Sequence, residues 1–437
     1  MTARQTIATL RKYESRNVMF FEPDGSWPIV WERAQGVHVW DADGKKYLDL
    51  TAAFGVAAAG HANPNVVLAG QKQMAKLLHA MGDVHPHALK AELARELSRI
   101  TFERWAKRNR KPETGNRKWG KVIFSNSGFE AVESALKTAI LATGKRGIIA
   151  FEGGYHGLGY GALNATHRDF FRAPFRSQLR RFGHFARFPK AKTDLPILEK
   201  TLRQIFRREK IGAILVEPVQ ARGGTNIPPL GFLPRLRKLC DEHDALLILD
   251  EIYTGFGRTG KWFACEHSGV VPDLICLGKA LTGGFPLSAC IGRADLMDAA
   301  WPASNGEAIH TSTFLGHPVG CAMALAQIKE IQRLKLRERS AKLGAHLLDL
   351  LSTINYQPAA VRGLGLMVGV ELDLPDGKPA TKVVLDAIKA LLHRGYIFLP
   401  EGEHGNIISF TPPLTITKAQ LAKAVRELKK LLAADPR

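Results

Sequence analysis

Long hydrophobic runs are missing from this 437-residue sequence, and we expect no secretory leader from its opening residues. No apolar stretch approaches the roughly 20 residues that span a bilayer, which argues against a membrane protein. The opening residues, MTARQTIATLRKYESRN, hold no apolar core of roughly 7–15 residues behind a basic cluster. Hydrophobic residues make up 45% and charged residues 23%, as in an average globular protein. We therefore expect a folded protein that stays in the cytoplasm.

Cysteine is scarce, and its spacing excludes two further classes of protein. The five cysteines are odd in number, widely separated, and include no CxxC pair. Disulfide frameworks and structural zinc sites are normally built from paired cysteines at short spacings. We predict no metal site, and we expect free and mostly buried thiols at Cys240, Cys265, Cys276, Cys290 and Cys321.

Acidic residues are also in deficit, with 41 Asp and Glu against 61 Lys and Arg and a formal net charge of +20. The densest basic stretch, residues 103–121, carries two tryptophans among its cations, and such a stretch can bind single-stranded nucleic acid. A solvated polar loop is the alternative. No helix-turn-helix, RNA-binding or zinc-finger pattern accompanies the charge. We therefore expect the positive charge to favour solubility and to attract anions, and not to mark a nucleic-acid site. A nucleic-acid-binding protein stays a remote alternative.

Between about 85 and 320, short apolar runs alternate with helical stretches, which is typical of a parallel sheet covered on both faces. The runs are VIF at 122–124, GIIAF at 147–151, AILV at 213–216, LLIL at 246–249 and LICL at 274–277. In open α/β sheets, ligands bind outside the carboxyl ends of the strands. The residues that follow these runs are therefore the candidates for chemistry.

The two ends of the chain have a different pattern. A short β region at 20–50 comes first, and one long amphipathic helical segment begins at 321. Strand candidates at 366–372 and 396–399 and a helix at 417–433 follow. We predict an α/β protein with a large domain at 61–320 and a smaller α+β domain formed by residues 1–60 and 321–437.

The run at 122–124 leads into Asn126-Ser127-Gly128 and then into a helix. Ser127 and Glu130 have the spacing of a capping box, which by itself indicates only a well-made helix start. The free N–H groups and positive end of the same helix attract an anion, and Gly128 lets it approach. A phosphate cradle and a plain helix start both stay open at this point.

The next run ends in FEGGYHGLGYGA, where Gly157, Gly159 and Ala162 match the dinucleotide pattern GxGxxA. The following residues form no apolar-periodic helix, and no acid stands about 20 residues further on, so a Rossmann site is disfavoured. Tyr155 and His156 matter more. An aromatic side chain at a strand end can lie flat on a planar ring, although a core tyrosine is the alternative.

Two runs end in acids, Glu217 in EPVQ and Asp250 in LDEIYTGFG. An apolar strand ending in Asp-Glu also resembles the Walker B strand of an ATPase, but the chain lacks the GxxxxGK[ST] loop that such an enzyme needs. The run at 274–277 ends in Gly278-Lys279. Burial lowers the pKa of a lysine and frees its amine to attack a carbonyl, whereas a surface lysine is the alternative.

The combination decides between these alternatives. Four features are all expected on one edge of one sheet: the acid Asp250, Lys279 29 residues later, the aromatic side chain of Tyr155 and the anion-binding helix start at Gly128. Together they fit a planar aldehyde cofactor with a phosphate tail.

At this point the sequence resembles the class III (ω-type) aminotransferases, pyridoxal-phosphate enzymes of fold type I, the aspartate aminotransferase fold. The resemblance covers most of the chain. Its motifs are GVHVWDADGKKYLDL, GHANPNV, NSGFEAVESALKTA, FEGGYHG, EPVQ, LDEIYTGFGRTG, PDLICLGKALTGGFPLSA, HTSTFLGHPVGCAMALA and PPLTIT.

The resemblance implies a role for each candidate residue. Lys279 would carry the Schiff base and Asp250 would pair with the pyridine nitrogen of pyridoxal 5'-phosphate. Thr313 would reach the phosphate of the other subunit in a homodimer or in a pair of such dimers. The further cofactor contacts it implies are Ser127, Gly128, Phe129, Tyr155, His156, Glu217, Ile252 and Tyr253.

Three departures from the family pattern concern the substrate. Members that use glutamate carry an arginine in an IIRFxPPL-like segment, where this chain has Ser409 in NIISFTPPL. They also have EPxQGE, where this chain has EPVQARGG with Ala221 and Arg222. Tyr253 replaces a frequent glutamine near the cofactor hydroxyl. We expect 2-oxoglutarate to be bound differently or not used, and Arg222 is a candidate to capture a carboxylate.

The expected reaction moves an amino group from an amine or ω-amino acid to a 2-oxo acid of the pyruvate type. Other reactions stay open, because one fold supports several chemistries. FEGGYHG also resembles the glutamate-semialdehyde aminomutases, and related folds include amino-acid racemases. GFGRTG and the HTSTFLGHP segment favour transamination.

Overall fold

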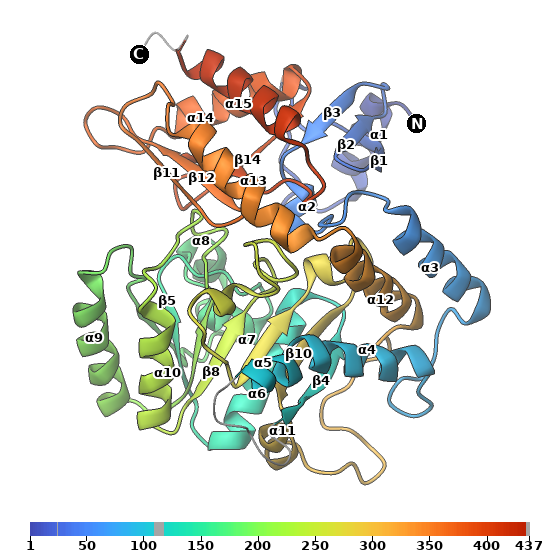
Figure 1. Ribbon diagram of the computed structural model, residues 1–437, viewed down its shortest axis with the longest axis vertical. Helices are drawn as coiled ribbons and strands as arrows, with labels where there is room; N and C mark the ends of the chain where they lie inside the picture. The colour runs from blue at the N-terminus through green and yellow to red at the C-terminus, as the bar shows by residue number, and fades with distance from the viewer. Residues whose placement is uncertain (24, 109–117, 434–437) are drawn as a thin grey trace.

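The computed structural model describes residues 1–23, 25–108 and 118–433, and its centre is a seven-stranded sheet (Figure 1). The strand order is β4-β10-β9-β8-β7-β5-β6. Every neighbouring pair is parallel except the two pairs that β10 makes with β4 and β9. The strands are β4 Gly120–Ser125, β5 Gly147–Phe151, β6 Gly183–Ala186, β7 Ile211–Val216, β8 Leu246–Asp250, β9 Leu274–Leu277 and β10 Ser288–Arg293.

Both faces of this sheet are covered by helices, because neighbouring residues of each strand join opposite apolar clusters. In β8, Leu247 and Leu249 pack in one cluster with Leu236 of α10, whereas Ile248 packs in the other with Val132 of α6. A strand buried on both sides must be apolar throughout, which explains the continuous runs in the sequence. The helices of this part are α4 Ala88–Ile100, α5 Phe102–Arg108, α6 Gly128–Thr143, α7 Tyr160–Ala165, α8 Asp169–Arg172, α9 Asp194–Arg208, α10 Phe232–Glu242 and α11 Ala294–Ala300, with short 3-10 turns η2 Ala173–Phe175, η3 Ala264–His267 and η4 Lys279–Leu281.

Two four-stranded sheets lie in the upper part of Figure 1, where both chain ends also lie. One has the order β1-β2-β3-β13 and the other β11-β12-β15-β14. The parallel pairing of β13 with β3 joins the end of the chain to its beginning. Their strands are β1 Trp31–Gln35, β2 His38–Asp41, β3 Lys46–Asp49, β11 Ala359–Gly363, β12 Val368–Leu372, β13 Tyr396–Ile397, β14 Leu399–Glu401 and β15 Ile407–Phe410.

The described helices outside the central layers include three near the start and four near the end of the chain. They are α1 Ala3–Tyr13, α2 Ala52–Gly55, α3 Pro64–Lys76, α12 Pro318–Arg333, α13 Leu336–Leu351, α14 Thr381–His393 and α15 Lys418–Ala433. The small sheets thus draw on both ends of the chain, although the boundaries at residues 60 and 320 stay a prediction. None of the described helices is long and apolar enough to cross a bilayer.

Two details differ from the expectations. The helical segment from 321 is two helices rather than one, because the chain turns at Lys335, whose φ of 50° lies in the left-handed region. The sheet also contains β10, an antiparallel strand that the apolar runs did not reveal. Its sequence, SACIGR, has small residues in place of a branched apolar run.

Candidate active site

A cavity of about 520 Å³ lies at the carboxyl ends of β7, β8 and β9. Glu217 follows β7, Asp250 ends β8, and Lys279 comes two residues after β9. The three groups expected at one sheet edge do lie on one cavity wall. The full lining is Phe54, Gly128, Phe129, Tyr155, His156, Gly157, Leu158, Glu217, Ala221, Arg222, Asp250, Ile252, Tyr253 and Lys279.

Asp250 is held by two contacts on the cavity floor. Its Oδ2 lies 2.8 Å from Nδ1 of His156, and its Oδ1 accepts a 3.1 Å hydrogen bond from the N–H of Ile252. Asp250 is 4% exposed and His156 is 3% exposed. A buried carboxylate with fixed hydrogen bonds has one orientation and keeps its acceptor capacity for a ligand in the cavity.

Glu217 is a second buried carboxyl, and it lies on the neighbouring strand. It accepts a 2.9 Å hydrogen bond from the N–H of Tyr155 and a 3.0 Å hydrogen bond from the N–H of Ala221. Burial raises the pKa of Glu217 to about 7, and the negative charge of Asp250 acts in the same direction. Glu217 therefore fixes the backbone that presents Tyr155 and Ala221 to the cavity.

Lys279 has the features of a reactive lysine. It is partly buried, and burial lowers the pKa of its ammonium, while the charges of Asp250 and Glu217 oppose that shift. Its Nζ lies 4.8 Å from the centre of the Tyr253 ring. The backbone of Lys279 has a φ of 43°, a left-handed conformation that costs about 1–3 kcal/mol for a residue with a side chain. Such strain is concentrated at functional sites.

The start of helix α6 also lines the cavity, through Gly128 and Phe129. The Glu130 carboxylate accepts hydrogen bonds from the N–H of Ser127 at 2.7 Å and from its Oγ at 2.8 Å, so the capping box is present. A Cβ on Gly128 would lie 3.1 Å from the side chain of Ile252, and one on Gly157 would lie 2.3 Å from that of Phe129. These glycines allow the helix start, the Tyr155 loop and Ile252 to close around a narrow space.

Two tyrosines line the rest of the cavity. The OH of Tyr253 lies 3.2 Å from Oγ1 of Thr411, which comes from the small-sheet part of the chain. Burial raises the pKa of Tyr253 to about 12, so the phenol stays protonated. The guanidinium of Arg222 lies 5.0 Å from the centre of the Tyr155 ring. The sequence pattern identified both tyrosines but gave no partner for either.

Three of the predicted site residues do not line this cavity. Ser127 caps α6 beside it, and the Oγ of Ser288 donates a 2.6 Å hydrogen bond to the Ser127 carbonyl. Ser409 is buried in β15. Thr313 is exposed in the loop before α12. In the part of the chain that is described, no three His, Cys, Asp or Glu side chains are grouped as metal ligands would be.

One charged residue near the cavity was missed by the sequence patterns. Glu401 ends β14 and is 8% exposed. Its charge acts on Tyr253 and Lys279. The available signal was an acid shortly after the apolar run IFL, separated from it by Pro400, in a short segment outside the central sheet.

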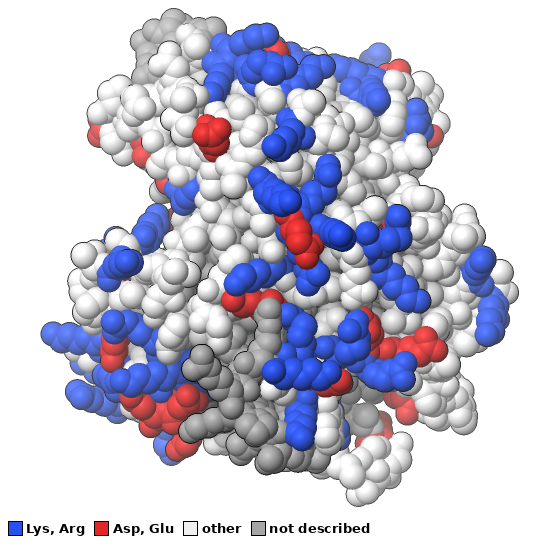
Figure 2. Space-filling model, viewed as in Figure 1, with Lys and Arg blue, Asp and Glu red and all other residues white. Residues whose placement is uncertain are grey.

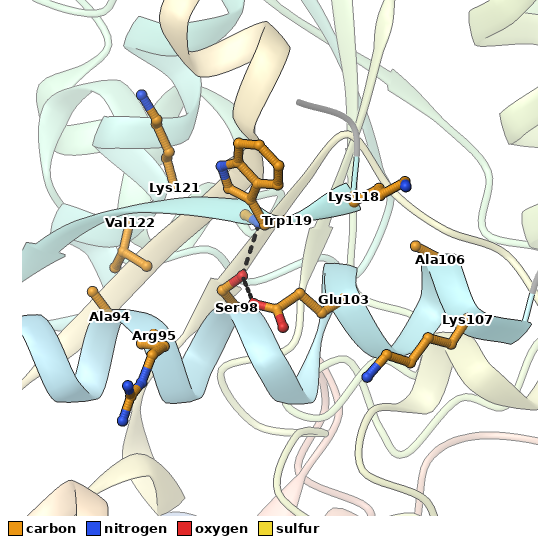
Figure 3. Close-up of a pocket in the computed structure, with 11 residues that line it drawn as sticks. Ala94, Arg95, Ser98, Glu103, Ala106, Lys107, Lys118, Trp119, Lys121 and Val122 are labelled. Carbon is orange, nitrogen blue, oxygen red and sulfur yellow. Dashed lines mark hydrogen bonds between the residues drawn. The ribbon is translucent and has the colours of Figure 1, made fainter. Parts of the chain in front are cut away.

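The basic stretch at 103–121 lies beside a different and larger cavity of about 1070 Å³ (Figure 3). Residues 109–117 of the stretch are outside the described part of the structure. Of its two tryptophans, Trp119 lines the cavity, whereas Trp105 is 4% exposed and packs against Phe102 and Phe263. Trp105 is therefore a core residue that cannot stack on a base.

This larger cavity also holds an internal polar contact. Ser98 accepts a 3.0 Å hydrogen bond from the N–H of Gly120 and donates a 2.8 Å hydrogen bond to Glu103. On the face drawn in Figure 2, Lys and Arg side chains occur over both the upper and the lower parts, with Asp and Glu among them. The positive charge is thus spread over this face and is not confined to the basic stretch.

The fold and the cavity together define a pyridoxal-phosphate enzyme of fold type I. The chain belongs to the class III aminotransferase family, because the family model Aminotransferase class-III matches residues 21–432. Members of this family use pyridoxal phosphate. The class predicted from the sequence motifs is confirmed, and so is the mainly parallel sheet.

The chain is similar to aminotransferases that are named for ornithine derivatives and ω-amino compounds. It is 37% identical to the acetylornithine aminotransferase of Methanosarcina mazei, over 93% of this chain and 92% of the relative. It is 36% identical to the 5-aminovalerate aminotransferase of Pseudomonas aeruginosa, over 91% and 92%. A solved amine transaminase from an uncultivated Pseudomonas species, in a PLP-bound form, has a TM-score of 0.84 at 29% identity, covering 97% of this chain and 98% of that one.

Proposed function

We propose that this aminotransferase transfers an amino group from an amine or an ω-amino acid to a 2-oxo acid of the pyruvate type in two alternating half-reactions. The observation that carries the proposal is Lys279, a strained, partly buried lysine that shares one cavity with Asp250 and whose pKa is lowered by burial. A lysine amine attacks an aldehyde, and an acid at the far side of the ring keeps the pyridine nitrogen protonated.

The residues of the cavity fit pyridoxal phosphate, whose ring, when bound, accepts the electrons left at the substrate Cα. Asp250 would hold the proton of the ring nitrogen, and His156 would keep the Asp250 carboxylate oriented. Lys279 would move a proton between the substrate Cα and C4′ of the cofactor. Tyr155 and Ile252 would contact the two faces of the ring.

The start of α6 suits the phosphate. Free N–H groups at a helix start bind an anion without a cationic side chain, and this start lines the same cavity as Lys279. We propose that Gly128 and Phe129 bind the phosphate through their N–H groups, together with Ser127. Glu217 and Tyr253 would contribute through the hydrogen bonds that hold the surrounding backbone and Thr411.

The substrate preference rests on Arg222. Its side chain lines the cavity, and no arginine stands at Ser409 to bind a glutamate α-carboxylate. An Arg fork binds a carboxylate with two parallel hydrogen bonds. The similarity to a 5-aminovalerate aminotransferase and to an amine transaminase supports ω-amino acids and amines as donors.

We also propose a homodimer, with Thr313 acting on the cofactor phosphate of the partner. Thr313 is exposed and does not line the cavity of its own chain. Large apolar side chains are exposed at 68–84, a segment that the Thr313 loop contacts through Thr311 and Asp83, and at Phe314, and such a group of side chains indicates an interface. They are Leu68, Met74, Leu77, Leu78, Met81, Val84 and Phe314. The five cysteines are free and buried, which suits the proposed cytoplasmic location.

An acceptor panel tests the reaction. Purified holoenzyme is incubated with amines, ω-amino acids and α-amino acids, each with pyruvate, with 2-oxoglutarate or without any 2-oxo acid. The proposal predicts product that depends on the acceptor, with pyruvate better than 2-oxoglutarate. Product without an acceptor would identify an aminomutase, and loss of chirality of an α-amino acid would identify a racemase.

A further inference from the structure

The aromatic ring of Tyr253 lies against the amine of Lys279. The Nζ of Lys279 is 4.8 Å from the ring centre. Tyr253 stands three residues after the end of β8 and Lys279 two residues after the end of β9, so two neighbouring strands bring them together. A cation within about 6 Å of the centre of an aromatic ring is attracted by the electron-rich face of that ring. The contact therefore favours a proton on Nζ.

Several contacts hold the Tyr253 ring in this place. Its OH lies 3.2 Å from Oγ1 of Thr411, which in turn donates a 3.3 Å hydrogen bond to the carbonyl of Thr51. Because the Thr411 hydroxyl has only one proton, the tyrosine O–H is the donor of the first bond. A Cβ on Gly55 would lie 3.1 Å from Cε1 of the ring, so this glycine lets the chain pass close beside it. The ring also packs against a small apolar cluster of Val219, Ala221 and Met367.

The phenol is uncharged, so the attraction comes from the ring face and not from a phenolate. Burial raises the pKa of Tyr253 to about 12, and the charge of Glu401 acts in the same direction. The hydrogen bond to Thr411 and the charges of Arg258 and Arg222 oppose the shift. The ring thus contacts the lysine as a neutral aromatic group at any pH near neutrality.

The charged groups around Lys279 act on its Nζ without touching it. Asp250, Glu217 and Glu401 favour the ammonium form, whereas burial and the charge of Arg222 disfavour it. In the described part of the chain, the Nζ makes no hydrogen bond or ion pair with any of these groups. The ring of Tyr253 is therefore a direct contact that stabilises the charged nitrogen.

We propose that Tyr253 is a positioning residue that holds the Nζ of Lys279 over its ring and stabilises the proton on that nitrogen during transfer between the substrate Cα and C4′ of the cofactor. This inference rests on the proposed function, because it concerns the lysine assigned to that transfer. A glutamine, which the family pattern often has at this position, lacks a ring and cannot supply the contact.

Competitive labelling of the full-length chain, freed of cofactor, tests the contact without turnover. A trace of acetic anhydride reacts with neutral amines, and mass spectrometry of the peptide that contains PDLICLGKALTGG measures the labelling of Lys279 at each pH. In Tyr253→Leu, we expect the midpoint of this pH profile to fall by about 0.4–1.5 pH units, because no ring then favours the ammonium form. Tyr253→Phe keeps the ring and should stay near the wild-type midpoint.

Tyr13→Leu is the matched control, because Tyr13 is an exposed tyrosine whose ring centre lies 5.0 Å from Nζ of another lysine, Lys12. Its Lys279 profile should equal that of the wild type. The holoenzyme supplies a spectroscopic measurement of the same effect. The yellow absorbance of lysine-bound cofactor fades as the Lys279 nitrogen loses its proton, and the pH of this change should also fall in Tyr253→Leu but not in Tyr253→Phe.

The proposal is overturned if Tyr253→Leu keeps the wild-type midpoint. It is also overturned if Tyr253→Phe lowers the midpoint as much as Tyr253→Leu does, since the hydroxyl and not the ring would then act. If Tyr253→Leu does not fold, Tyr253→Gln also lacks a ring and should show the same fall. Failure of the proposed function is a separate outcome. In that case the wild type transaminates no donor, while the labelling midpoint of Lys279 still depends on the ring of Tyr253.

Discussion

The two sides of the active-site cavity differ in how their charged groups are satisfied. On the large-sheet side, Asp250 contacts His156 and the N–H of Ile252, and Glu217 accepts two backbone N–H bonds. On the side facing the small sheets, burial raises the pKa of Glu401 and the charge of Arg222 opposes that shift, but no hydrogen bond or ion pair joins the two side chains within the described residues. A cofactor that stays bound suits fixed partners, whereas alternating substrates need groups that can exchange partners.

The end of β8 repeats this contrast on two adjacent residues. Asp250 faces the cavity, whereas Glu251 is completely buried and accepts hydrogen bonds from Thr254, Ala264 and Cys265. Glu251 therefore fastens the loop after β8 to η3. Asp250 is thus the acid of the pair that we propose to act on the cofactor, whereas Glu251 holds the fold together.

The largest effect should come from Lys279→Ala. We expect the variant to lose the yellow colour of lysine-bound cofactor and to lower kcat by about 10⁴-fold, because the amine serves in both cofactor attachment and proton transfer. The measurements are visible absorbance and turnover. Lys378→Ala, at an exposed lysine in the turn after β12, should behave as the wild type. A Lys279→Ala protein that retains substantial transamination would contradict the assignment.

Asp250→Asn should have the next largest effect. The amide keeps the shape of the carboxylate but cannot hold the ring nitrogen charged, so we expect kcat/KM to fall about 10²- to 10³-fold. Cofactor should still attach to Lys279. Near-normal turnover in this variant would show that the acid has no electronic role.

Glu251→Gln sharpens the comparison with its neighbour. Both carboxylate oxygens of Glu251 accept backbone N–H groups, so an amide NH₂ would face a donor. We expect the free energy of unfolding to fall by about 1–3 kcal/mol, while the cofactor absorbance and KM stay unchanged. Denaturant unfolding measures the stability, visible absorbance measures the bound cofactor, and steady-state kinetics measures KM. An unchanged stability with impaired chemistry would reverse the roles given to the two acids.

The smallest effect concerns pH. The carboxyl of Glu401 has a pKa of about 7 in the fold against an ordinary 4.5. The folded protein therefore binds a proton that the unfolded chain does not bind between these values, and stability falls as the pH rises from 4.5 to 7. Between pH 5.5 and 7.5 the free energy of unfolding of Glu401→Gln should therefore fall by about 1–2 kcal/mol less than that of the wild type. Denaturant midpoints at the two pH values measure this difference. An equal change of stability with pH in the wild type and in Glu401→Gln would refute the prediction.

Much of the large-sheet side was predictable from the sequence. Strands buried on both faces must be apolar, so β5, β7, β8 and β9 stood out as continuous runs. Because parallel strands present their carboxyl ends at one edge, the residues after those runs had to lie close together. Glu217, Asp250 and Lys279 follow from that rule alone.

The remaining features depend on contacts between distant segments. Strand β10 has small residues and pairs antiparallel, so no apolar run marked it. The turn at Lys335 has neither glycine nor proline to announce it. Glu401 comes close to Arg222 only because β14 packs beside the loop after β7, a tertiary arrangement that neither local sequence contains. The burial of Trp105 likewise depends on Phe263, far along the chain.

The covalent attachment site tests the central claim most directly. Borohydride reduction makes a lysine–cofactor link permanent, and peptide mapping by mass spectrometry then locates the modified residue. The account predicts one modified lysine, Lys279, in the peptide that contains PDLICLGKALTGG. Modification of any other lysine as the main product, or no modified peptide from a cofactor-saturated protein, would contradict it.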